Sequence, residues 1–178
     1  MPSSHKEIAD RDTKRFQAEL AFSDSLADSM VVLDTSFAMH RGLANLVERD
    51  LLKPGRHRIY VPQKVLEELL RLWNKRTEPV AKVAENGLEL IYRLRAAHMA
   101  HFDILERRYQ YGYIADQAII ELVNQHMKSR NLIVLTNDFA LSNAILAISS
   151  VVRRRHSLGV CSWNECTDNF TYWSRGSV

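Results

Sequence analysis

The stretch MVVLDTSF, residues Met30 to Phe37, decides the fold of this chain. Its four apolar residues run directly into an acid, and such an unbroken run with β-branched members predicts a strand that is buried on both faces. In open α/β sheets, ligands bind in the crevice outside the carboxyl ends of the strands, which is where Asp34 is expected. The alternative is that Asp34 only caps the helix that follows. The choice depends on whether other acids converge on the same place.

Apolar segments farther along the chain repeat the strand pattern. Further strands are predicted at 58–61, 131–136 and 158–163, the last of them near an edge. Helical periodicity or helix-start signals favour helices at 10–26, 37–52, 62–74, 78–100, 114–128 and 139–149. Strands that alternate with helices predict an α/β fold with a mostly parallel sheet.

Composition and length are those of one soluble globular domain. The chain has 178 residues, 46% of them hydrophobic and 25% charged. No apolar run approaches the roughly 20 residues that cross a bilayer, and the polar first residues show no secretion signal. Two cysteines make neither a disulfide framework nor a zinc site, so we expect a cytoplasmic protein without a membrane partner. We expect a tail and helix at 1–29, the main domain at 30–165 and a tail at 166–178.

The net charge of +3 is weakly basic, but the basic residues are clustered. Such clusters can neutralise the phosphates of a nucleic acid, whereas the alternative for each one is a solvated helix face. The clusters lie at 53–58, 71–76, 93–95, 107–108 and 153–155.

Three further positions offer carboxylates to the end of the strands. Asp138 follows the apolar run 131–136 as Asp34 follows its own, and either Asn137 or Asp138 is expected to cap the next helix. Asp116 falls on the apolar face of its helix, roughly 50° from the centre of that face. A carboxylate turned inward is costly unless it is paired or binds a metal, although a first-turn acid also suits the helix dipole. Glu67 and Glu68 flank an apolar helix face, and their angles do not decide between them.

Carboxylates that crowd together need cations, because like charges raise one another's pKa values. Oxygen ligands suit Mg²⁺ or Mn²⁺. One or two such ions, typically ~3.5–4 Å apart when there are two, would clamp a phosphodiester and activate a water.

The order of these motifs resembles the PIN-domain nucleases. The matching segments are VLDTS at 32–36, VPQKVLEEL at 61–69, ADQAI at 115–119 and LTNDFAL at 135–141. The resemblance covers about 31–163 and implies a three-layer α/β/α sandwich with a mostly parallel central sheet. Each motif is short, and their order makes the signal specific.

The resemblance also implies the site residues. Asp34, Glu68, Asp116 and Asp138 match the four acids that bind metal and catalyse, with Glu67 as the alternative to Glu68. Supporting positions match polar neighbours of the metal: Thr136, Asn137 and Ser36. Ser36 departs from the Asn that is common at its position, but it can still donate a hydrogen bond.

The implied activity is that of a Mg²⁺- or Mn²⁺-dependent endoribonuclease acting on single-stranded RNA. The resemblance further suggests the toxin of a toxin–antitoxin pair, with an antitoxin or other regulatory protein as partner, and a homodimer. The alternatives are an RNA- or protein-binding module without catalysis, and a phosphatase or phosphoacceptor domain built on Asp34. Phosphatases of the haloacid-dehalogenase type usually carry a second Asp two positions on, where this chain has Ser36.

Overall fold

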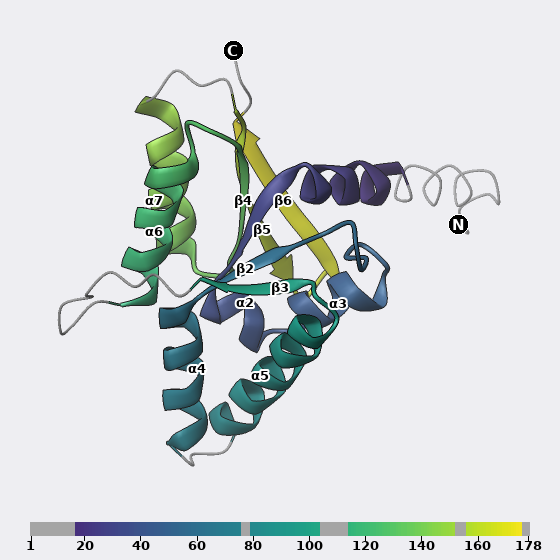
Figure 1. Cartoon of the computed structure of the whole chain (residues 1–178), viewed down its shortest axis with the longest axis vertical. Helices are drawn as coiled ribbons and strands as arrows, with labels where there is room; N and C mark the ends of the chain where they lie inside the picture. The colour runs from purple at the N-terminus through teal and green to yellow at the C-terminus, as the bar shows by residue number, and fades with distance from the viewer. Residues whose placement is uncertain (1–16, 76–78, 104–113, 152–155, 176–178) are drawn as a thin grey trace, which may run out of the picture.

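The computed structural model describes residues 17–75, 79–103, 114–151 and 156–175. Within them, six strands form one sheet in the order β3-β2-β1-β4-β5-β6 (Figure 1). The first five strands run parallel, and β6 pairs antiparallel with β5. The strands are β1 (Ser29–Leu33), β2 (Ile59–Pro62), β3 (Ala100–Asp103), β4 (Asn131–Leu135), β5 (Leu158–Asn164) and β6 (Asn169–Arg175). The predicted, mostly parallel sheet is confirmed.

Strands β1 and β4 form the centre of the sheet and are buried as their apolar runs predict. Val31 pairs with Ile133 and Leu33 pairs with Leu135, and the exposed fraction of all four side chains is 0%. Because β1 and β4 run parallel in this register, the chain leaves both strands at the same level. The residues that follow, Asp34 and Thr136, therefore begin side by side.

Helices cover both faces of the sheet, which gives the predicted three-layer α/β/α sandwich (Figure 1). Helices α6 and α7 lie together on one face, and α2, α4 and α5 pack together on the other. The helices are 17–27 at the N-terminal end, α2 (Thr35–Met39), α3 (Gly42–Glu48), α4 (Gln63–Asn74), α5 (Val80–Ala96), α6 (Ala115–His126) and α7 (Phe139–Val151). None of the helices in the described ranges is long and apolar enough to span a membrane.

The prediction of a single helix at 37–52 is wrong, because two short helices occupy this stretch. His40 ends α2 in an extended conformation with φ −95° and ψ 165°. Gly42 then begins α3 pressed against Phe37 and Trp163, where a Cβ atom would come within 2.8 Å of the Phe37 ring. The chain turns there so that both short helices can pack on the sheet.

The helix expected at 78–100 ends earlier, and a strand that the sequence did not indicate follows it. His98 takes a left-handed conformation, with φ 58°, and its N–H donates to Arg95 O at 2.9 Å. Met99 N–H donates to Leu94 O at 2.8 Å, which closes the end of α5. The chain then reverses into β3, so His101 lies on a strand rather than on a helix.

The C-terminal residues join the sheet. Residues 169–175, which we expected in a tail, form β6 along β5, so β6 and not β5 is the edge strand. Phe22 of the N-terminal helix packs against Phe170 and Tyr172, with ring centroids 5.7 and 5.5 Å apart. The boundaries expected at 29/30 and 165/166 stay predictions. The basic clusters at 107–108 and 153–155 lie outside the described residues.

Candidate functional site

Asp34 lies at the carboxyl end of β1 and is 3% exposed. Its Oδ2 accepts hydrogen bonds from Ser36 N–H at 3.2 Å, from the Ser36 hydroxyl, and from Thr136 Oγ1 at 2.7 Å. Asp34 is thus the N-cap of α2, as one alternative predicts, but its carboxylate is also tied to β4. Burial raises the pKa of Asp34 above its ordinary value, and the hydrogen bonds from Ser36 and Thr136 oppose that rise.

Asp138 occupies the matching place beyond β4. Its Oδ1 accepts a hydrogen bond from Leu141 N–H at 2.9 Å, so Asp138 caps α7. Its own N–H donates to Thr136 Oγ1 at 3.0 Å. Asn137 does not face the crevice freely, because its Oδ1 accepts from Trp163 N–H on β5 at 2.8 Å. Asn137 therefore ties two strands together, and its N–H donates to Ser36 Oγ at 2.9 Å.

The two neighbouring glutamates of α4 point to different surroundings. Glu68 is half-buried, and its Oε2 accepts a hydrogen bond from Thr35 Oγ1, next to Asp34, at 2.8 Å. Glu67 is exposed and is engaged with Gln63 and Lys64 of its own helix. The structure thus distinguishes the two positions that the helix angles left open, and it is Glu68 that lies beside the end of β1.

Asp116, in the first turn of α6, brings the four acids into one electrostatic group. Burial raises the pKa of Asp116, and the charges of three carboxylates raise it further in the order Asp34, Asp138 and Glu68. We call these four side chains, which come from α4, α6 and the ends of β1 and β4, the acidic site. Each was singled out from the sequence.

The donor set of the acidic site fits a hard divalent cation. All four ligating groups are carboxylates, and a cation among them would offset the repulsion that raises the pKa of Asp116. Across the described ranges, no three acidic, His or Cys side chains are already close enough to form a ready metal-ligand group. The fit therefore rests on the chemistry and charge of the four side chains.

A small hollow of about 210 Å³ adjoins the acidic site between α4 and the start of α6. It is lined on the α4 side by Lys64, Glu67, Glu68 and Arg71 and on the other side by Ile114 and Ala115. A larger hollow of about 840 Å³ lies between the N-terminal helix and β6, away from the four acids. Charged side chains converge on the smaller hollow.

Two residues of this region have partners that the sequence did not indicate: Thr35 was assigned no role, and Arg71 only a place in the basic cluster at 71–76. Thr35 holds Glu68, and the signal for it was its place directly after Asp34 in the strand-end motif. Arg71 lies 3.6 Å from Glu68, and the signal was the spacing of three residues on one helix. Other polar residues could stand at either position, so the sequence does not identify the side chain that Thr35 or Arg71 contacts. The fold does.

Comparison with known proteins adds a family. The PIN domain family profile matches residues 31–150. Among curated proteins, no match is found. One similar solved structure is a domain of a functionally unknown protein from Methanocaldococcus jannaschii DSM 2661. It is 22% identical, with a TM-score of 0.49, and the match covers 72% of this chain and 90% of that one.

Proposed function

The chain belongs to the PIN-domain family, and from this premise we propose that it is a Mg²⁺- or Mn²⁺-dependent endoribonuclease that hydrolyses phosphodiester bonds of single-stranded RNA. PIN domains are in general nucleases and typically use divalent metals. One observation carries the proposal: the pKa of Asp116 is raised by burial and then by three other carboxylates, which come from three different elements. Such a set suits a cation and a phosphodiester better than it suits a neutral ligand.

The four acids are the metal ligands in this proposal. Asp34, Glu68, Asp116 and Asp138 would hold the ion. When bound, a divalent ion supplies positive charge that polarises the phosphodiester and favours attack by water.

Hydroxyl groups next to these acids orient the carboxylates. Ser36 and Thr136 fix Asp34 through its Oδ2, and Thr35 fixes Glu68 through its Oε2. Asp138 keeps its position because it caps α7. The scaffold thus fixes the carboxylates before any substrate arrives.

The direct test is cleavage of labelled single-stranded RNA with Mn²⁺, with Mg²⁺ and with chelator. We expect cutting with a divalent ion, none with chelator, and none with Asp116→Asn. Glu68→Gln should also abolish cutting, whereas Glu67→Gln, one residue away and paired within its own helix, should cut like the wild type. Full activity of Asp116→Asn would contradict the proposal. A parallel panel of single-stranded and flap DNA separates RNA from DNA as the substrate.

A second candidate is a PIN-like module that binds RNA or protein without cutting. It is favoured by the lack of a ready metal-ligand group within the described ranges and by the three hydrogen bonds that already engage Asp34 Oδ2. Calorimetric titration with Mn²⁺ separates the two candidates: binding that Asp116→Asn removes supports the nuclease, and no binding supports the module. The toxin role, an antitoxin partner and a homodimer stay predictions of the family resemblance.

A further inference from the structure

We propose that Arg58 and Arg130 bind phosphate groups of a single-stranded RNA in a pocket at the amino ends of the strands, on the rim opposite the acidic site. The inference rests on the proposed function in one respect, namely that the chain's substrate is RNA. It concerns how the strand is held and not how it is cut.

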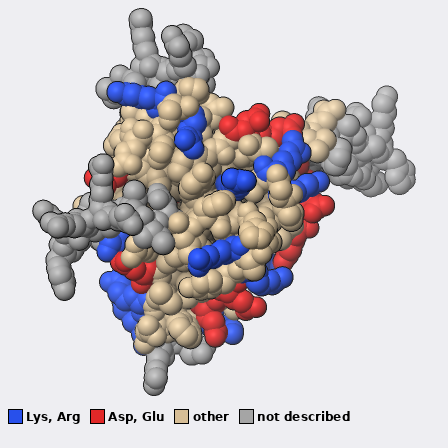
Figure 2. Space-filling view, viewed as in Figure 1, with Lys and Arg blue, Asp and Glu red and all other residues tan. Residues whose placement is uncertain are grey.

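The pocket, called here the amino-end pocket, has a volume of about 490 Å³. Residues that precede β1, β2 and β4 converge on it, because parallel strands begin at the same rim of a sheet. Three arginines line it against a single acid, Asp28. In Figure 2, Lys and Arg side chains lie beside the N-terminal helix together with Asp and Glu side chains. Its other polar lining residues are Ser29, Tyr60 and Ser129.

Two of these arginines are available to a ligand. Arg58 and Arg130 are both exposed, and within the described residues neither side chain has a hydrogen bond or an ion pair. The third, Arg56, is paired with Asp24 of the N-terminal helix. A guanidinium without a protein partner suits a phosphate, which it can bind through two parallel hydrogen bonds.

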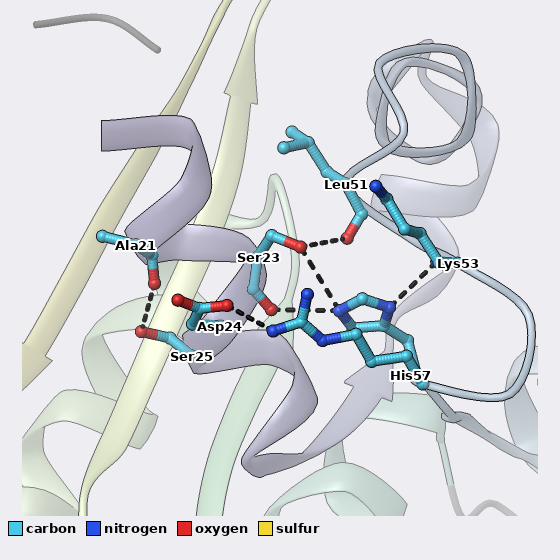
Figure 3. Close-up of polar contacts among 8 residues, drawn as sticks. Ala21, Ser23, Asp24, Ser25, Leu51, Lys53 and His57 are labelled. Atoms are coloured by element: carbon cyan, nitrogen blue, oxygen red, sulfur yellow. Dashed lines mark hydrogen bonds and ion pairs between the residues drawn. The ribbon is translucent and has the colours of Figure 1, made fainter. Parts of the chain in front are cut away.

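The segment that carries Arg58 is held in place by a buried histidine (Figure 3). His57 is 1% exposed, and its Nδ1 accepts a hydrogen bond from Lys53 N–H at 2.9 Å. The ring proton is therefore on Nε2, which donates to Ser23 O at 3.0 Å. The Ser23 hydroxyl in turn donates to Leu51 O at 3.2 Å. Because His57 lies between Arg56 and Arg58, this network fixes the backbone of both and lowers the entropy that is lost on binding.

Two aromatic rings lie side by side next to the amino-end pocket. Tyr60, which lines the pocket, is stacked on His101 of the neighbouring strand with ring centroids 5.9 Å apart. Arg58, which directly precedes β2, and Tyr60 both line the pocket. From Arg58 to the end of β2 at Pro62 is about 13 Å. Bases of a strand that crosses this distance can stack on the exposed His101 ring.

The test is RNA binding in the presence of chelator, where nothing is cut. Fluorescence anisotropy with labelled polyuridine gives the affinity of the full chain at several salt concentrations. The variant is Arg58→Gln/Arg130→Gln. The control is Lys82→Gln, with Arg58→Gln alone as its charge-matched comparison; Lys82 is exposed near the start of α5 and lies outside the basic clusters. Thermal melting checks that all the variants are folded.

Loss of two phosphate contacts should reduce the slope of log affinity against log salt by about 1.4. At about 0.1 M salt the same loss weakens binding roughly 25-fold, whereas the control should stay near the wild type. Equal slopes for the variant and the control would overturn the inference, as would a wild type that does not bind RNA. A free mononucleotide that binds in this pocket while RNA affinity is unchanged would reassign the pocket to nucleotides and overturn the RNA placement. RNA binding that depends on the arginines, together with no cleavage under any metal, would instead contradict only the proposed nuclease.

Discussion

Replacing His57 by Ala should destabilise the whole chain, because this side chain joins the N-terminal helix to the segment before β2. Its two ring nitrogens are both engaged, one by Lys53 N–H at 2.9 Å and the other by Ser23 O at 3.0 Å. Alanine removes both partners at once. The ring is 1% exposed and Ser23 is buried, so the Ser23 carbonyl that is left behind is not returned to open solvent, whereas Lys53 is exposed.

The size of the effect follows from the buried carbonyl of Ser23. A buried polar group that loses its partner costs about 1–3 kcal/mol, so the variant should lose about that much unfolding free energy. That is a sizeable share of the ~5–15 kcal/mol that is typical of a folded domain. At roughly 2–4 °C per kcal/mol for a chain of this size, the melting temperature should fall by roughly 2–12 °C.

Urea unfolding followed by circular dichroism measures the difference directly. The matched control is His101→Ala, since His101 is exposed on the short strand β3 and should cost less than about 1 kcal/mol. If His57→Ala loses no more stability than this control, the reasoning is refuted, because the buried network would then carry none of the predicted free energy.

Three other changes test the packing, the acidic site and the thiols. Gly87→Ala should destabilise the fold although alanine favours helices, because the added Cβ would lie 2.8 Å from Ala38 O; a rise in melting temperature would contradict this close packing. In chelator at neutral pH, Asp116→Asn should melt above the wild type. The raised pKa of Asp116 means that its ionised form weakens the fold, so the difference should shrink as the pH falls through that pKa. A lower melting temperature for that variant at neutral pH would contradict the repulsion. In the native state a thiol reagent should label Cys166, which is exposed. It should leave Cys161 unlabelled, because Cys161 is buried and burial raises the pKa of its thiol. Equal labelling of both cysteines would show that solvent reaches Cys161 on β5.

The sequence was informative about the central strands because their apolar runs admit few alternatives. In β1 and β4, residues on both faces are buried, so a continuous apolar run and a strand are nearly the same statement. Strand β3 has four residues and includes the exposed His101, so it carries no such run. It is specified instead by its pairing with β2, for example Tyr60 with His101, and pairing between distant segments leaves no local signal.

The sequence of strand β6 carries a signal that is typical of a strand. Phe170 and Tyr172 alternate with Thr171 and Trp173, and period-two alternation is typical of a strand with two different faces. Phe170 and Tyr172 both pack against Phe22 of the N-terminal helix. A tail was expected at 166–178, because the residue on which these rings pack lies nearly 150 residues away in the sequence.

Some residues of the acidic site can be placed from the sequence around them, and others cannot. Asp34 and Asp138 could be placed from the sequence because each directly follows a buried strand. The choice between Glu67 and Glu68 could not be made from the sequence, because these adjacent residues both flank the apolar face of their helix. It depends on Thr35, which belongs to another element and bonds to Glu68. A helical wheel describes one helix, whereas a site is defined by the neighbours of that helix.

The two rims of the sheet suit opposite tasks because they keep opposite charges apart. A cation close to the acids becomes engaged with them, as Arg71 does with Glu68 at 3.6 Å. Strand β1 has five residues, which separates the rims by about 17 Å. That is more than the ~8–10 Å over which salt screens exposed charges, so Arg58 and Arg130 neither neutralise the carboxylates nor compete with a metal for them. A polyanionic strand can therefore be held by arginines at one rim while the carboxylates of the other remain free to bind cations.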